Sequence, residues 1–156
     1  MMPALSHSRH RMLHRLLDGI VDQAPAIPVN DMTLDSRRVT PGALFVALSG
    51  TRVHGLQYVD QAIANGCCAV LAEPDANWSR EHIDALGLAV PVMVIDDLRF
   101  RIGMIASRFC GEPSEKLKII GYTGTNGKSS CVWLTAGVLE NCVMIGTMGN
   151  GGPGRL

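Results

Sequence analysis

The sequence lacks an excess of charge of either sign. Fourteen lysines and arginines balance fourteen aspartates and glutamates, so the formal net charge at pH 7 is +0. A nucleic-acid-binding protein needs a basic stripe that neutralises phosphates, and no dense basic stretch occurs here. We therefore expect no nucleic-acid partner, and any recognition of phosphate has to be local.

Long apolar runs are missing as well. No stretch approaches the roughly eighteen apolar residues of a membrane-spanning helix. The N-terminal residues 1–10 lack the apolar centre of a secretory signal peptide. We expect no membrane span and a cytoplasmic protein.

The five cysteines contain no Cys-x-x-Cys pair and are odd in number. Cys67 and Cys68 are adjacent in an apolar run, and neighbouring side chains of a strand point to opposite faces. We expect these two to pack rather than to form a bridge. Reduced thiols in a reducing compartment fit this pattern best.

Short apolar segments alternate with amphipathic ones, which is typical of an α/β fold. The predicted strands are 31–34, 43–48, 67–72 and 91–95. The predicted helices are 7–18, 56–65, 79–86 and 98–110. The turn signal Gly-Glu-Pro-Ser at 111–114 ends this pattern. We therefore predict a first domain at residues 1–111 and the start of a second domain at 112–156.

The predicted helix 7–18 carries three histidines at helical spacing, namely His7, His10 and His14. On paper they could hold a metal ion. The arginines between them favour a solvated helix face instead.

The second domain begins with the β-branched segment 116–120, which predicts a buried parallel strand. A glycine-rich loop, a helix at 129–140 and a strand at 143–145 follow, and the glycine-rich residues 148–156 are typical of a loop. Two parallel strands and one helix leave apolar faces uncovered. We expect an incomplete domain with exposed apolar surface around Trp133 and Val138.

The run Ile-Ile-Gly-Tyr-Thr-Gly-Thr-Asn-Gly-Lys-Ser-Ser at 119–130 indicates a phosphate-binding loop between a strand and a helix. Gly124 and Gly127 permit positive φ, so backbone N–H groups can converge on phosphate oxygens. Lys128 would place its ammonium against the β- and γ-phosphates of ATP. The hydroxyl of Ser129 would ligate Mg²⁺.

The strict eight-residue P-loop pattern is not met, because Tyr122 stands where its first glycine would fall. Two alternatives stay open. The run could be a glycine-rich turn that caps a helix, with Lys128 in solvent. It could also belong to an unrelated small P-loop NTPase, but such an enzyme needs an acidic metal ligand, and no strand ending in Asp follows Ser130.

Several motifs follow one another along nearly the whole chain. They are Thr-Leu-Asp-Ser-Arg at 33–37, Pro-Gly-Ala-Leu-Phe-Val-Ala at 41–47, Gly50, Gly55 and Gly-Thr-Asn-Gly-Lys-Ser-Ser at 124–130. In order and spacing they resemble the ATP-dependent Mur ligases of peptidoglycan synthesis. The first two motifs are similar to those of the members that add the third residue or the terminal dipeptide. The run 145–151, Ile-Gly-Thr-Met-Gly-Asn-Gly, is more like the third-residue enzyme.

The resemblance implies a ligase of three domains, which bind the UDP end of the substrate, ATP and the incoming amino acid. This chain would hold the N-terminal UDP-binding domain and the first strand-loop-helix-strand of the P-loop ATPase domain. ATP would phosphorylate a carboxylate of UDP-N-acetylmuramoyl-L-alanyl-D-glutamate. The amine of diaminopimelate or lysine would then displace phosphate and form an amide.

Carried over position by position, the resemblance implies two sites. The UDP-linked substrate would be contacted by Leu34, Ser36, Thr51, Arg52 and Val53. ATP would be bound by Gly124, Thr125, Asn126, Gly127, Lys128, Ser129 and Ser130, with Lys128 as the catalytic residue and Ser129 as the Mg²⁺ ligand. Judged without the resemblance, Asp35-Ser36 could be a strand-end turn and Arg37-Arg38 a solvated pair.

The chain stops before the other parts expected of the family, and the stretch 131–144 is a few residues shorter than the resemblance implies. We expect an N-terminal fragment that is inactive as a ligase by itself, with the remainder of the ligase as its partner. Two alternatives stay open. They are a stand-alone module that binds the UDP-linked precursor, and the related ligase that adds D-alanyl-D-alanine.

Overall fold

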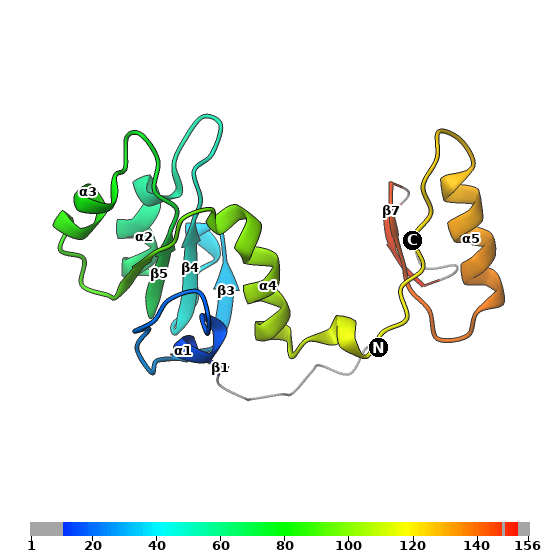
Figure 1. The fold of residues 1–156 in the computed structure, drawn as a ribbon, viewed down its shortest axis with the longest axis horizontal. Helices are drawn as coiled ribbons and strands as arrows, with labels where there is room; N and C mark the ends of the chain where they lie inside the picture. The colour runs from blue at the N-terminus through cyan, green and yellow to red at the C-terminus, as the bar shows by residue number, and fades with distance from the viewer. Residues whose placement is uncertain (1–10, 148, 153–156) are drawn as a thin grey trace. The chain divides into compact units, whose positions relative to one another are not determined.

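The computed structural model describes residues 11–147 and 149–152, and the chain divides between Glu115 and Lys116 into two compact units. The first unit is built on a parallel sheet with the strand order β3-β4-β5-β6 (Figure 1). Its strands are β3 (Asp31–Thr33), β4 (Ala43–Ala47), β5 (Ala69–Ala72) and β6 (Val92–Val94). The α/β class predicted from the alternating pattern is confirmed.

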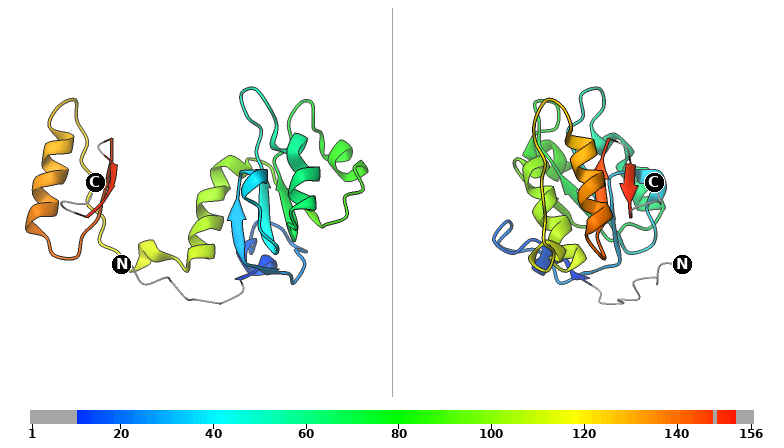
Figure 2. Two further views of the ribbon diagram at one scale, coloured as in Figure 1. Left: turned by 180° about the vertical axis from the view of Figure 1, so that it is seen from behind. Right: turned by 90° about the vertical axis from the view of Figure 1, so that its right-hand side faces the viewer.

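Helices cover both faces of this sheet (Figures 1 and 2). One face packs against α2 (Val59–Ala64) and α3 (Arg80–Ala85), and the other against α1 (Leu13–Leu16) and α4 (Leu98–Cys110). Short 3₁₀ turns occur at η1 (Ser36–Arg38), η2 (Gly55–Tyr58) and η3 (Pro113–Glu115). The predicted helices 56–65, 79–86 and 98–110 are confirmed, although the first begins as the η2 turn. Among the described helices, none is long and apolar enough to cross a membrane.

The two central strands supply a core on each side of the sheet. Every residue of β4 and β5 is buried, because each strand has a neighbour on both sides and helices above and below. Side chains alternate between the faces, so Leu44 packs towards α1 and α4, and Phe45 towards α2 and α3. In register, Phe45 lies between Thr33 of β3 and Val70 of β5.

The adjacent thiols of Cys67 and Cys68 join opposite core clusters, as their predicted alternation requires. All five cysteines are free, and burial raises the pKa of both thiols. Protonated, packed thiols agree with the expectation that these residues do not form a bridge.

In the part that the structure describes, the predicted helix 7–18 is confirmed only at residues 13–16 and is wrong at Arg11 and Met12. Arg11 and Met12 form strand β1, which pairs antiparallel with β2 (Pro28–Val29), and α1 has only four residues. The pairing with β2 competes with the helix for the same backbone groups, which periodicity cannot reveal. His7 and His10 lie outside the described residues, within which no group of three side chains could hold a metal.

The described residues of the second unit form one helix and one hairpin. Helix α5 (Lys128–Val138) follows the glycine loop, and β7 (Met144–Gly146) pairs antiparallel with β8 (Gly149–Gly151). The predicted helix 129–140 and strand 143–145 are confirmed with small shifts at their ends. The loop predicted from residue 148 onwards is wrong for β8, because backbone pairing with β7 does not depend on apolar side chains.

The buried parallel strand predicted at 116–120 is wrong. Leu117, Ile119 and Ile120 are exposed, and no described residue pairs with this segment. A strand requires a neighbour that takes its backbone hydrogen bonds, so an apolar β-branched run is not sufficient. The expected exposed apolar surface is present: Trp133 is 52% exposed and Val138 is 83% exposed.

Candidate functional site

The loops that follow the parallel strands of the first unit meet at one edge of the sheet, which we call the carboxyl edge. Parallel sheets bind ligands at this edge, because their strands all end there and leave room for loops of different lengths. The loops after β3, β4 and β5 hold every residue that the resemblance assigns to the UDP-linked substrate, together with several further polar side chains.

The loop after β4, residues 49–54, is short and closed. Ser49 and His54 form an antiparallel bridge at its base. A Cβ at Gly50 would lie 2.3 Å from the carbonyl oxygen of Val53, so glycine permits the loop to fold on itself. Thr51, Arg52 and Val53 form its exposed tip. Three of the predicted substrate residues are therefore presented together to solvent.

The other two predicted substrate residues follow the neighbouring strand β3. Leu34 is 57% exposed, whereas Ser36 is buried. The Ser36 hydroxyl donates to Gln61 Oε1 at 2.6 Å, and Asn65 Nδ2 donates to the Ser36 carbonyl at 2.9 Å. The hydroxyl of Ser36 thus ties η1 to α2, while Leu34 offers apolar surface at the carboxyl edge.

Asp35 and Arg37 form a local cap at the start of η1. The Asp35 carboxylate accepts from the backbone N–H of Arg37 at 3.0 Å and from its guanidinium at 2.8 and 2.9 Å. These hydrogen bonds, chiefly those from the guanidinium, lower the pKa of Asp35 to about 2. The strand-end turn considered for this motif is present, and it holds Leu34 and Ser36 in place.

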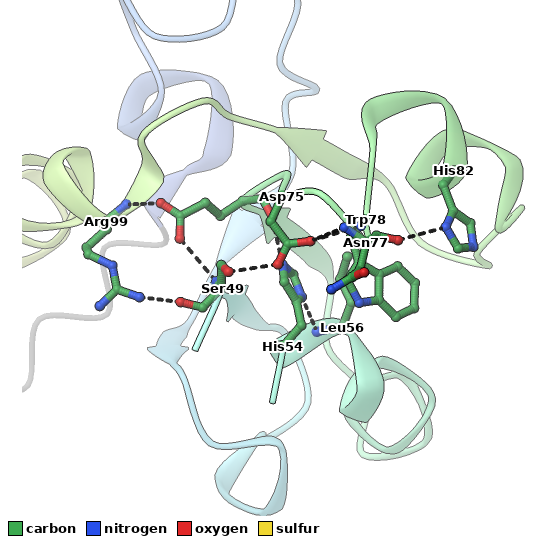
Figure 3. Close-up of polar contacts among 9 residues, drawn as sticks. Ser49, His54, Leu56, Asp75, Asn77, Trp78, His82 and Arg99 are labelled. Atoms are coloured by element: carbon green, nitrogen blue, oxygen red, sulfur yellow. Dashed lines mark hydrogen bonds and ion pairs between the residues drawn. The ribbon is translucent and has the colours of Figure 1, made fainter. Parts of the chain in front are cut away.

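A buried carboxylate holds the base of the 49–54 loop. Glu73 follows β5 directly and is only 9% exposed. Its Oε2 accepts from the backbone N–H of Ser49 at 3.1 Å, and its Oε1 accepts from the backbone N–H of Arg99 at 3.0 Å. The guanidinium of Arg99 donates to the Ser49 carbonyl (Figure 3). Loops from β4 and β5 and the start of α4 are joined in this way.

His54 and Asp75 complete the network (Figure 3). The buried His54 ring accepts from the backbone N–H of Leu56 at Nδ1, at 3.0 Å, and its Nε2 lies 2.7 Å from the Glu73 carbonyl oxygen. Since Nδ1 accepts, the proton of the neutral ring is on Nε2, which donates to that carbonyl. Asp75 accepts from the Ser49 hydroxyl at 2.8 Å.

The pKa of Asp75 is below the ordinary value of 3.8, chiefly because the Ser49 hydroxyl bonds to its carboxylate, with the N–H groups of Asn77 and Trp78 and the nearby His54 adding to this. Because the pKa of Asp75 is lower in the folded state, its ionised form stabilises the fold. This stabilisation is fully present above pH 3.8 and is lost as the pH falls through the folded-state pKa.

We predict that acidification loosens this network with a midpoint below 3.8. Trp78 is one of two tryptophans and lies 5.7 Å from the His54 ring, so its fluorescence in a Trp133→Phe background reports the change. The acid transition should disappear in Asp75→Asn. A midpoint above 3.8, or the same transition in Asp75→Asn, would contradict the assignment.

The glycine loop of the second unit precedes α5. Gly124 and Gly127 have φ values of 136° and 77°, the positive values predicted for them. Lys128, the first residue of α5, folds its ammonium back onto the carbonyl of Gly124 and lies 3.4 Å from that of Thr125. The helix N-terminus and this ammonium favour an anion at the loop.

A pocket of about 220 Å³ lies beside the loop within the second unit. Lys128, Ser129, Trp133 and Gly146 are among the residues that line it. Its chemistry fits a phosphate next to an apolar surface. Carboxylates for a metal ion are scarce, because Glu140 is the one acidic residue between 116 and 156.

Sequence reasoning missed the network of Ser49, His54, Glu73, Asp75 and Arg99. These residues are up to 50 positions apart, and none belongs to a motif. One weak signal exists: Glu73 follows a run of apolar residues at the predicted end of a buried strand, a place where a charge needs partners.

A parallel α/β unit with its polar loops at the carboxyl edge, followed by a glycine loop at a helix N-terminus, is an architecture of ligand-binding enzymes. The sequence profile of the family described as "Mur ligase family, catalytic domain" matches residues 28–110, which is more than half of the chain. The chain belongs to the Mur ligase family. The matched stretch covers the four-stranded sheet and does not include the glycine loop.

Two curated relatives bear the name UDP-N-acetylmuramoyl-L-alanyl-D-glutamate–2,6-diaminopimelate ligase. The protein from Alkalilimnicola ehrlichii is 40% identical over 136 residues, which are 83% of this chain and 27% of the relative. The protein from Xanthomonas oryzae pv. oryzae is 43% identical over 148 residues, which are 94% of this chain and 28% of the relative. The chain therefore spans little more than a quarter of the length of these relatives.

Solved structures give the same fold. A UDP-N-acetylmuramoyl-L-alanyl-D-glutamate–2,6-diaminopimelate ligase matches with a TM-score of 0.69 and 27% identity over 94% of this chain and 30% of its own. The D-alanyl-D-alanyl ligase from Acinetobacter baumannii matches with a TM-score of 0.59 and 24% identity over 80% of this chain and 27% of its own. The latter likeness concerns the fold alone.

Proposed function

We propose that this chain supplies the UDP-binding domain and the phosphate loop of an ATP-dependent amide-forming ligase. Its substrate is UDP-N-acetylmuramoyl-L-alanyl-D-glutamate, and diaminopimelate is the amino acid added. The observation that carries the proposal is the grouping of Leu34 with Thr51, Arg52 and Val53 on adjacent loops of one sheet edge, in a chain 40% identical to a ligase of that name. Residues 1–111 bind the UDP end, and residues 112–156 open the ATP-binding domain.

The residues of the proposed UDP-end site would bind different parts of the substrate. Arg52 brings a guanidinium to an otherwise uncharged loop tip, and such a group binds a pyrophosphate through paired hydrogen bonds. Leu34 and Val53 are exposed apolar side chains on which a uracil ring can rest. Backbone groups at the tip can recognise the edge of the ring.

In the second unit the proposed ATP ligands are the residues from Gly124 to Ser130. Phosphate replaces the loop carbonyls as the partner of the Lys128 ammonium, and the N–H groups at the start of α5 bind its oxygens. Bound Mg²⁺ neutralises phosphate charge, with Ser129 as its one proposed ligand from this chain. No protein nucleophile takes part in the proposed reaction.

A second candidate function is binding of the UDP-linked precursor without catalysis. The observation that favours it is the shortage of carboxylates near Ser129, where Glu140 is the one acidic residue of the unit. Both functions require precursor binding, but only the ligase function requires the glycine loop to bind ATP. Titration of the chain with ATP and Mg²⁺ separates the two.

The test of UDP-end recognition is calorimetric titration of the 156-residue chain with UDP-N-acetylmuramoyl-L-alanyl-D-glutamate. We expect Arg52→Ala to weaken binding about tenfold, because a charged hydrogen-bond donor to the pyrophosphate is lost. The matched control is Arg101→Ala, which removes the same charge from an exposed position on α4. Equal affinities of the Arg52→Ala chain and the unaltered chain would refute the assignment of Arg52.

A further inference from the structure

The tip of the 49–54 loop has no regular secondary structure apart from the bridge at its base, yet both of its ends are held by several hydrogen bonds. Ser49 uses its N–H, its carbonyl and its hydroxyl, which bond to Glu73, Arg99 and Asp75. His54, at the other end, uses both ring nitrogens. The residues between them, Thr51 to Val53, are exposed.

Glu73 is the common partner of both ends. Its side chain accepts from Ser49, and its backbone carbonyl accepts from His54. Its own N–H donates to the Ala47 carbonyl at 3.0 Å and so continues the ladder between β4 and β5 past the end of the strands. One residue therefore connects the rigid sheet to both ends of the loop.

Burial of this carboxylate has a free-energy cost that packing alone does not offset. A buried ion must regain in hydrogen bonds what it loses in hydration. Glu73 receives two backbone N–H groups, one of them in the first turn of the thirteen-residue helix α4, whose N-terminus favours a negative charge. An apolar side chain here would leave both N–H groups without a partner.

We propose that Glu73 is a positioning residue that holds the 49–54 loop in its ligand-binding shape before the UDP-linked substrate arrives. This inference rests on the proposed function of the loop tip. A loop that is ordered in advance does not have to lose conformational freedom on binding, so the interaction energy of its tip is retained as affinity. Glu73 itself does not touch the substrate.

Glu73→Gln tests the proposal with almost no change in size. A glutamine has one acceptor oxygen and one NH₂ group, so it cannot accept from both Ser49 and Arg99. One backbone N–H then faces another donor, and the loop loosens. The matched control is Asp96→Asn, which also replaces a carboxylate by an amide, in the loop that follows β6. Asp96 pairs with Arg80 and is 74% exposed at its side chain.

Two measurements on the full 156-residue chain decide the matter. Amide hydrogen exchange in Glu73→Gln should speed up about tenfold at residues 49–54 and stay unchanged in β4 and β5. Affinity for UDP-N-acetylmuramoyl-L-alanyl-D-glutamate should fall about tenfold. Asp96→Asn should change neither quantity.

The alternatives give different results. A merely structural role would raise exchange across the whole sheet and lower the thermal midpoint, with equal affinity per folded molecule, and this would overturn the proposal. Unchanged affinity in Glu73→Gln, with normal binding by the unaltered chain, would overturn it while leaving the proposed function intact. Absence of binding by the unaltered chain would refute the proposed function and with it this role of Glu73.

Discussion

Lys128→Ala is expected to weaken ATP binding by the chain about ten- to a hundredfold. The ammonium of Lys128 lies against the loop carbonyls of Gly124 and Thr125, at the place where phosphate oxygens would converge. Its removal takes away the cation that offsets phosphate charge, and hydrogen bonds to charged groups contribute enough to account for a change of this size. The measurement is equilibrium titration with a fluorescent ATP analogue in the presence of Mg²⁺.

The matched control for Lys128 is Lys118→Ala. Lys118 is exposed, carries the same charge and precedes the loop. General charge attraction to ATP would weaken binding equally in both variants. A loss confined to Lys128→Ala supports a specific phosphate loop, whereas equal and small losses support the alternative of a glycine turn with a solvated lysine.

Phe45→Ala is expected to lower the free energy of unfolding of the first unit by about 3–5 kcal/mol. Phe45 is 1% exposed at the centre of the sheet, between β3 and β5, and packs against the α2 and α3 side. This loss is a large fraction of the total free energy of unfolding of a domain, which is roughly 5–15 kcal/mol. Urea titration gives the value, with Trp78 fluorescence as the probe in a Trp133→Phe background.

The control for Phe45 is the same substitution at Phe100, which is 84% exposed on α4. Its removal should change the free energy of unfolding by less than about 0.5 kcal/mol. Because Trp78 packs against the same core cluster as Phe45, its signal follows the first unit and not the second. Similar effects of the two substitutions would contradict the described packing of β4.

The fold of the first unit could be predicted from the sequence where a segment's own pattern decides its structure. Helix α4 spans the predicted residues 98–110, and it ends at Gly111, whose φ of 81° is the left-handed conformation that glycine favours. The strands β4 and β5 were predictable as apolar runs between turn signals. In these segments local preference and tertiary packing agree.

Predictions failed where the structure depends on a partner elsewhere in the chain. The segment 116–120 has the composition of a buried strand, yet it has no neighbour among the described residues and is exposed. Arg11 and Met12 have a helical pattern and pair with β2 instead. Backbone pairing between distant segments leaves little trace in the periodicity of either segment.

Some residues of the candidate site could likewise be predicted from the sequence, and others could not. The glycine loop could be predicted from its own residues, because phosphate-binding backbones require glycines at fixed places. The tip of the 49–54 loop could be assigned only through the resemblance to the Mur ligases. The residues that hold the 49–54 loop could not be predicted, since Ser49, Glu73 and Arg99 meet only after β4, β5 and α4 have assembled. Their polar side chains would otherwise pass for surface residues.

The central claim is that the loops after β3 and β4 form the UDP-end site, and nuclear magnetic resonance titration of the 156-residue chain tests it most directly. With UDP-N-acetylmuramoyl-L-alanyl-D-glutamate, the largest amide shift changes are expected at Leu34 and at Thr51 to Val53, with little change along the exposed face of α4 around Phe100. Shift changes confined to residues away from the carboxyl edge, or none at saturating ligand, would contradict the account.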